Sequence, residues 1–149
     1  MKHSDLTGKI IGCYYTVYNE LGYGFLESVY EKAMAIELAK QGLNFVCQHP
    51  ITVYYDGQVV GEFRADILVE DAVIVELKAA SQIAIPHESQ LLNYLNATDY
   101  EVGLLCNFGP KAEYKRMVFS IERKKYRPPH SRHSAPLDSD PTVPLEPKP

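Results

Sequence analysis

Two acidic residues and one lysine lie within strongly apolar sequence near the middle of the chain. Asp66 precedes the apolar run 67–69, and Glu76 and Lys78 are the only charged residues in the segment 73–79. Charged side chains in such runs are costly to bury unless they are paired, reach a solvated cleft or bind a metal ion. We therefore expect this stretch to carry the chemistry of the protein.

The two segments are predicted to form antiparallel strands joined by a three-residue loop, 70–72. Directly opposite residues of an antiparallel pair project from the same face, and side chains alternate along each strand. If opposite positions sum to 142, Asp66 lies opposite Glu76, and a shift of one residue would mix the two faces. This register predicts a continuous apolar face of Phe63, Ala65, Ile67, Val69, Val73, Val75 and Leu77. The other face then carries Arg64, Asp66, Leu68, Ile74, Glu76 and Lys78.

The flanking sequence predicts the elements that position these residues. Helical spacing predicts a first helix, capped by Asp5 or Thr7, to about residue 21, and a second over about 26–41 that ends at Gly42. Strands are expected at 45–48, 51–55 and 59–69, with a hairpin at Asp56-Gly57. Pro86 opens a predicted helix over 87–96, and strands follow at 102–108 and 117–122.

The composition changes near residue 127. Seven of the 10 prolines lie in the last 23 residues, among Ser, Asp and His and with few apolar side chains. We expect residues 1–126 to form one domain and residues 127–149 to be a disordered, proline-rich tail. A proline-rich docking site in this tail is the alternative interpretation.

The net charge limits how the protein could bind nucleic acid. The chain of 149 residues is 46% hydrophobic and 23% charged, as expected for one soluble globular domain, and its formal charge is −4. Because phosphate attraction supplies most nonspecific affinity, an acidic domain needs a local basic patch or bound cations to bind DNA or RNA. The candidate patch consists of Lys111, Lys115, Arg116, Arg123, Lys124, Lys125 and Arg127.

The cysteines and the N-terminal sequence indicate a cytoplasmic protein. Cys13, Cys47 and Cys106 are widely spaced and form no CxxC pair, which favours buried free thiols over a disulfide or a zinc site. No signal-type hydrophobic region and no apolar span of membrane length is present, so no membrane association is expected.

Four motifs occur in a fixed order along the chain. The segment 24–30 fits GxxExxY, Asp66 with Glu76 and Lys78 fits D…ExK, the segment 90–94 fits QxxxY, and Asn-Phe-Gly follows at 107–109. In this order the chain resembles the PD-(D/E)XK nuclease superfamily and, within it, the bacterial GxxExxY protein family, over about residues 10–121. The resemblance implies the fold class α/β (α+β), with a restriction-endonuclease-like core in which helices flank a central mixed β-sheet. Ala65 stands where the superfamily name implies proline, so the strand before Asp66 is expected to differ in geometry.

The resemblance also implies a metal site. Mg²⁺ (or Mn²⁺) prefers oxygen ligands and keeps several waters, so Asp66 and Glu76 could hold it, with the backbone carbonyl of Leu77 as a further implied ligand. Lys78 would then orient or help deprotonate a metal-bound water. A surface Glu76–Lys78 pair of little energetic value is the alternative. Glu27 is either an additional metal or metal-supporting acid, or a carboxylate favoured by the helix dipole.

Further residues would support the same chemistry. Gln90 and Tyr94 lie four apart on one helical face and offer neutral donors for a phosphate or a metal-bound water. The alternative is a solvated Gln90 and a Tyr94 that fills space. For His87, a role in the chemistry and a purely structural role are both open. Tyr30 is expected either over the site or in the core, and Arg64 either meets a phosphate or screens the acids.

The sequence thus predicts a small Mg²⁺-dependent nuclease whose catalytic residues are Asp66, Glu76, Lys78, Gln90 and Tyr94. Its expected partner is DNA or RNA, and a protein partner or a homodimer is the further possibility. The alternative function is a catalytically inactive nuclease-like fold that serves as a nucleic-acid-binding or protein-binding module.

Overall fold

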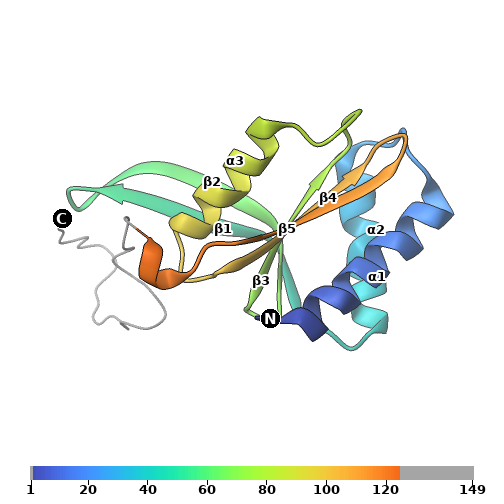
Figure 1. Cartoon of the computed structure of the whole chain (residues 1–149), viewed down its shortest axis with the longest axis horizontal. Coiled ribbons are helices and arrows are strands. Elements are labelled where there is room, and N and C mark those ends of the chain that lie inside the picture. The colour runs from blue at the N-terminus through green and yellow to red at the C-terminus, as the bar shows by residue number, and fades with distance from the viewer. Residues whose placement is uncertain (1, 125–149) are drawn as a thin grey trace.

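The computed structural model describes residues 2–124, so the predicted tail at 127–149 and the domain boundary at 126 lie outside the described part of the chain. Figure 1 shows the helices and strands within it. In chain order they are α1 (Ser4–Leu21), α2 (Glu27–Lys40), β1 (Phe45–Tyr55), β2 (Gln58–Val69), β3 (Val73–Lys78), α3 (Ile85–Asn96), β4 (Val102–Phe108), β5 (Ala112–Val118) and a short 3₁₀ turn (Ile121–Arg123).

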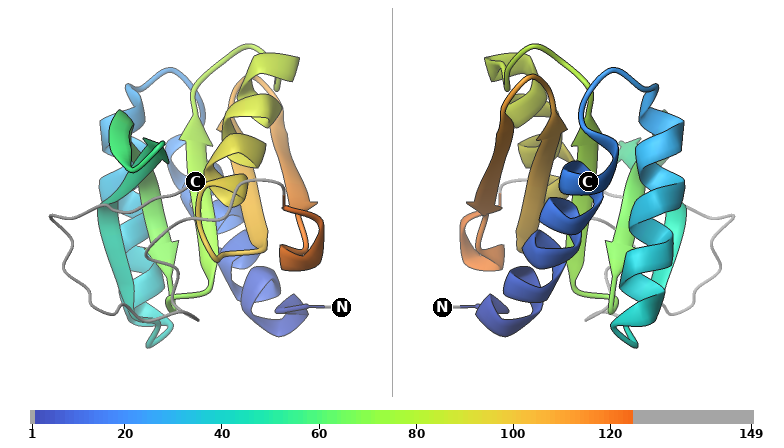
Figure 2. Two further views of the ribbon diagram at one scale, coloured as in Figure 1. Left: turned by 90° about the vertical axis from the view of Figure 1, so that its left-hand side faces the viewer. Right: turned by 90° about the vertical axis from the view of Figure 1, so that its right-hand side faces the viewer.

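The five strands form one mixed sheet in the order β1-β2-β3-β4-β5. Strands β3 and β4 are parallel, because α3 carries the chain back to the other end of the sheet, and the other neighbouring pairs are antiparallel. Helices α1 and α2 cover one face of the sheet and α3 covers the other (Figure 2). The predicted fold class, a central mixed sheet flanked by helices, is confirmed.

Helices on both faces give the sheet two hydrophobic cores. The larger core joins α1 and α2 to one face through residues such as Tyr14, Tyr30 and Met34. The smaller core packs Leu91 and Leu95 of α3 against the opposite face. Because both faces of β3 and β4 are covered, these two strands are almost entirely apolar, as strands buried on both faces usually are. A charged residue on β3 is therefore unusual and needs an explanation.

The predicted register of β2 and β3 is confirmed. Ile67 lies opposite Val75 and Val69 lies opposite Val73, with the loop at 70–72 between the strands. The ladder ends at the Ile67–Val75 pair, whereas β2 continues its pairing with β1, and β3 its pairing with β4. The two strands therefore separate at Asp66 and Glu76, and the space between them forms a fork.

The prediction of one continuous apolar face from Phe63 to Leu77 is wrong at its first two residues. Ile67 packs in the larger core, but Ala65 packs in the smaller core, and Phe63 contacts the α3 residue Tyr94. The change of face occurs where Gln48 of β1 adopts a left-handed backbone conformation, with φ of 56°. Pairing between β1 and β2 skips this point, because Cys47 pairs with Ile67 and the next pair is His49 with Ala65. Beyond it, β1 and β2 form an arm that extends from the body of the sheet (Figure 1).

Two predicted strands have different bounds in the structure. The segments 45–48 and 51–55 are one strand, β1, because Pro50 lies in an edge strand, where a missing N–H is tolerated. The last strand is β5 at 112–118 and not 117–122, since Phe108 already pairs with Ala112 across a short turn. The exposed, polar side chains of this edge strand obscured its period in the sequence.

The prediction of buried cysteines is confirmed for two of the three residues. The three cysteines are free; Cys13 and Cys106 are buried, and Cys47 is partly exposed. None of the helices between residues 2 and 124 has the length and apolar character needed to cross a membrane.

Candidate active site

Asp66 and Glu76 are locked together at the fork between β2 and β3. The backbone N–H of Asp66 donates to Oε2 of Glu76 at 2.8 Å, and the backbone N–H of Leu77 donates to Oδ2 of Asp66 at 2.7 Å. Each carboxylate thus accepts a backbone hydrogen bond from the opposite strand. These two bonds replace the β2–β3 backbone bonds, which end at the neighbouring Ile67–Val75 pair. This reciprocal bonding fixes both side chains and leaves the second oxygen of each for another contact.

Burial makes this acid pair unfavourable in its doubly ionised form. Glu76 is only 3% exposed, and its pKa is raised to about 8, first by the loss of solvent and then by repulsion from Asp66. Desolvation also raises the pKa of Asp66, and the N–H of Leu77 opposes that shift. A buried Glu76 and a half-buried Asp66 that repel each other form a site that a cation would stabilise.

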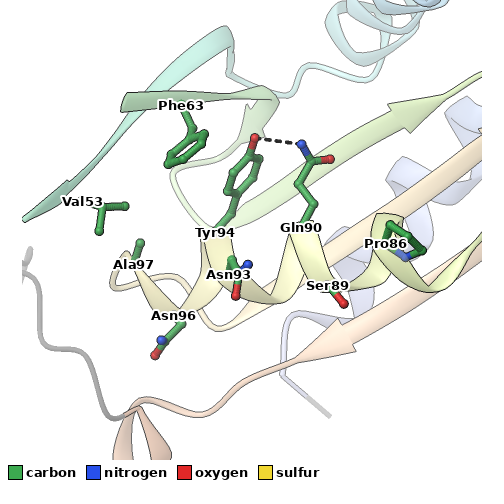
Figure 3. Close-up of a pocket in the computed structure, with 9 residues that line it drawn as sticks. All are labelled: Val53, Phe63, Pro86, Ser89, Gln90, Asn93, Tyr94, Asn96 and Ala97. Atoms are coloured by element: carbon green, nitrogen blue, oxygen red, sulfur yellow. Dashed lines mark hydrogen bonds between the residues drawn. The ribbon is translucent and has the colours of Figure 1, made fainter. Parts of the chain in front are cut away.

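A chain of hydrogen bonds connects β3 to α3 beside the acid pair. Lys78 Nζ donates to Oε1 of Gln90 at 2.7 Å. Nε2 of Gln90 in turn donates to the hydroxyl of Tyr94 at 3.1 Å (Figure 3). Burial raises the pKa of Tyr94, and the charge of Glu76 adds to the shift, which ties the tyrosine to the same electrostatic environment. The structure therefore brings together Asp66, Glu76, Lys78, Gln90 and Tyr94, and the roles predicted for them remain predictions.

Glu27 approaches the site from α2. Its Oε2 accepts the backbone N–H of Ala79 at 3.2 Å, directly after Lys78. Glu27 is also the first residue of α2, and no side-chain cap precedes it. It therefore joins the start of α2 to the end of β3, and both predicted interpretations, an acid that supports a metal ion and a carboxylate favoured by the helix dipole, remain open.

The sequence interpretation missed Glu31, a second acid on the same face of α2. Glu31 lies one helical turn after Glu27, raises the pKa of Asp66 by repulsion, and accepts a hydrogen bond from Nε2 of Gln48 at 2.7 Å. The spacing of four residues from Glu27 was a signal available in the sequence. The left-handed Gln48, which directs its amide to Glu31, had no such signal.

Three residues with open alternatives have structural roles. Tyr30 is fully buried and stacks on Phe108 at 4.0 Å, while its hydroxyl donates to the carbonyl of Gly22 and accepts the N–H of Phe25. It therefore lies in the core and holds the loop before α2. His87 accepts the N–H of Ala84 and caps α3. Arg64 donates to the carbonyl of Gln48.

The Asn-Phe-Gly motif fixes the loop that follows Lys78. Asn107 is completely buried, and its side-chain amide bonds both the N–H and the carbonyl of Ala80. A Cβ at Gly109 would lie 2.3 Å from the carbonyl oxygen of Ala80, so only glycine fits there. The motif therefore holds the end of β3 in place, close to Lys78 and Glu27.

The basic patch predicted near the end of the chain is wrong for Lys124, whereas Lys111, Lys115 and Arg123 are exposed as predicted. Lys124 is buried and donates to the carbonyls of Thr98 and Tyr100. Lys115 pairs with Glu88, and Arg116 donates to a backbone carbonyl near the N-terminus. These cations are used within the fold because the chain packs β5 and the following turn against α1, α3 and the loop after it. The other predicted members Lys125 and Arg127 lie outside the described residues.

No group of three or more His, Cys, Asp or Glu side chains placed to hold a metal ion occurs within residues 2–124. The arrangement offers paired acids, an adjacent ammonium group and neutral donors, a combination suited to hydrolysis of a phosphodiester.

Comparison with known proteins identifies a family for this arrangement. A protein-family model described as the PD-(D/E)XK nuclease superfamily matches residues 4–117. Among solved structures, the chain is similar to one titled "Crystal structure of SSO0001", with 17% sequence identity and a TM-score of 0.49. That match covers 63% of this chain and 50% of the other, so this chain spans about half the length of that protein. No curated protein matches the sequence.

Proposed function

Because the chain belongs to the PD-(D/E)XK nuclease superfamily, we propose that it is a divalent-metal-dependent nuclease that hydrolyses phosphodiester bonds of DNA or RNA. The observation that carries the proposal is the pair of half-buried Asp66 and buried Glu76, each bound to the other's strand at the fork, with Lys78 beside them. The motif at 24–30 supports assignment to the GxxExxY family within the superfamily.

The residues at the fork fit Mg²⁺ or Mn²⁺. Both ions prefer oxygen donors, and Mg²⁺ in particular keeps several waters, so two carboxylates and the carbonyl of Leu77 would be enough. A cation would also remove the repulsion that raises the pKa of Glu76. Glu27 and Glu31 would add negative charge nearby from α2. When bound, the metal ion would lower the pKa of the attacking water and neutralise charge on the phosphate.

The chain's own residues would hold and orient the reacting groups. Lys78 would orient the attacking water and favour its deprotonation through its positive charge, since its ammonium group is held by Gln90. Gln90 in turn is bonded to Tyr94, so the position of Lys78 depends on α3. Asp66 and Glu76 would hold the cation, and their N–H bonds keep each carboxylate aimed into the fork.

A second candidate function is a nuclease-like module that binds nucleic acid or a protein partner without cutting. The formal charge of −4 favours it, as does the use of Lys115, Arg116 and Lys124 in intramolecular bonds. Such a module would bind its partner with the same affinity in the presence and absence of a divalent cation.

A cleavage screen tests the proposal. The full chain would be incubated with labelled single-stranded and double-stranded DNA and RNA, with Mg²⁺, with Mn²⁺ and with EDTA. We expect cleavage of at least one substrate with a metal ion and none with EDTA, and a Glu76→Gln variant purified in parallel should be inactive. Intact substrates under every metal condition, with binding unaffected by EDTA, would support the second candidate instead.

A further inference from the structure

A groove lies between the β1–β2 arm and helix α3, next to the acid fork. Its volume is about 570 Å³, and Figure 3 shows its lining. Phe63 and Val53 form the wall on the arm, while residues along one side of α3 form the other wall. This volume is large enough for one nucleotide but is small for a folded partner.

The lining combines aromatic rings with neutral amides. Phe63 is 47% exposed, and its ring packs against that of Tyr94 with the ring centroids 5.9 Å apart. Gln90, Asn93 and Asn96 contribute three side-chain amides from α3. The Oδ1 atom of Asn96 is buried, and no donor to it is found within residues 2–124. No lining residue carries a charge.

The arm is shaped to present Phe63 to the groove. A Cβ at position 61 would lie 2.8 Å from the ring of Phe63, so Gly61 leaves the space in which this ring lies along the arm. The switch of face at Gln48 brings Phe63 to the α3 side of the sheet, where it meets Tyr94 and not the larger core. Both features leave the ring of Phe63 partly exposed toward the groove, whereas Tyr94 is buried and contributes only its edge of the lining.

The groove is continuous with the candidate active site. Gln90 and Tyr94 line it, and the same Gln90 side chain accepts the hydrogen bond from Lys78. A nucleotide that contacts Gln90 in the groove would therefore be separated from Lys78, which is expected to orient the attacking water, only by the Gln90 side chain.

Because the groove meets the proposed catalytic site in this way, we infer that it binds an unpaired nucleobase of the strand that is cut. The inference rests on the proposed nuclease function. Aromatic rings stack on a base of any sequence, and Asn and Gln amides bond its edges. A phosphate would need cations that the lining lacks. A base inside a duplex has its ring faces covered by neighbouring base pairs and its Watson–Crick edge paired, so the preferred substrate is single-stranded DNA or RNA, or a flipped-out nucleotide.

Binding measured without turnover tests this inference. Fluorescence anisotropy of a labelled oligonucleotide in EDTA would compare a single strand, the same sequence as a duplex, and an abasic strand that keeps the phosphates. DNA and RNA versions of each would be used. We expect the single strand to bind most tightly, and Phe63→Ala to weaken that binding by about tenfold, as expected for loss of one stacked base.

Two variants provide controls for folding and position. Tyr55→Ala removes an aromatic ring that is 75% exposed on the same arm but outside the groove, and it should leave binding within about twofold of wild type. Asn93→Ala changes an exposed groove residue that is not part of the core. It should weaken the binding of the single strand and leave the binding of the abasic strand unchanged.

The outcomes separate this inference from the proposed function. The base site would be overturned if the duplex or the abasic strand bound as tightly as the single strand. It would also be overturned if neither Phe63→Ala nor Asn93→Ala weakened single-strand binding, even if metal-dependent cleavage is observed. Single-strand binding that depends on Phe63, without cleavage under any metal condition, would support the base site and contradict the nuclease function.

Discussion

Lys78→Ala should lower metal-dependent cleavage by at least about a hundredfold, since removal of one positioned donor that stabilises transition-state charge typically costs between about a hundredfold and a thousandfold. The Lys78 ammonium group is fixed by Gln90 beside the acid pair, and its removal takes away the cation nearest to the attacking water. Initial rates on the substrate identified by the screen, at several pH values, would measure the effect. Lys78→Arg should also be impaired, because arginine keeps the charge but its larger planar guanidinium does not place that charge where the compact ammonium group lies.

The matched control is Lys40→Ala. Lys40 is an exposed lysine near the opposite end of α2 from Glu27, paired with Glu37, and its removal should leave the rate unchanged. Lys78 is not an expected metal ligand, so Mn²⁺ should still bind to Lys78→Ala. Cleavage at the wild-type rate by Lys78→Ala would mean that the activity comes from another site or a contaminating enzyme.

Glu76→Gln should stabilise the metal-free protein at pH 8 and have little effect at pH 5. The folded-state pKa of Glu76 is about 8, compared with an ordinary value of 4.5, so the folded chain holds this proton more tightly than the unfolded chain. Stability that is present below pH 4.5 is therefore lost as the pH rises from 4.5 through 8. Glutamine stays neutral at both pH values and avoids this loss. Because a tenfold change in proton affinity corresponds to about 1.4 kcal/mol, we expect a gain of about 2 kcal/mol or more at pH 8.

Denaturant unfolding in EDTA at pH 5 and pH 8 would measure this gain as a change in the free energy of unfolding. The control is Glu62→Gln, an exposed carboxylate on the same β2 strand as Asp66, which should alter stability equally little at both pH values. A Glu76→Gln variant that is destabilised by the same amount at pH 5 and pH 8 would contradict the burial of a strained acid pair.

The sequence predicted the register at the fork because two independent patterns required the same pairing. The alternation of apolar residues and the position of the acids both place Asp66 near Glu76, and the structure has this register. The order of helices and strands was predicted for a similar reason, since helical and strand periods differ most in long buried segments.

The sequence could not predict where β1 and β2 change face. That switch depends on a left-handed conformation at Gln48, a residue type with no strong preference for it, and the cost is met by tertiary packing. As a result, Phe63 and Ala65 were assigned to the wrong side of the sheet. The aromatic groove next to the candidate active site exists because of this switch, so its chemistry became visible only in three dimensions.

Contacts between distant segments were also beyond the sequence patterns. The bond between Glu27 and the N–H of Ala79, and the clamp of Asn107 on Ala80, join segments that the motifs named without relating them to one another. Lys124 was assigned to a basic surface patch because lysine is normally exposed, yet in the fold it supplies donors for two carbonyls in the loop after α3.

Calorimetric titration of the metal-free protein with Mn²⁺ tests the central claim most directly. If Asp66 and Glu76 hold a divalent cation, titration of the wild type should give a saturable binding heat. The affinity for Mn²⁺ should be higher at pH 8 than at pH 6, because the cation must displace the proton of Glu76. Asp66→Asn and Glu76→Gln should each abolish the heat, and Glu62→Gln should retain it. No heat from the wild type at pH 8, or the same heat from both site variants, would contradict the account.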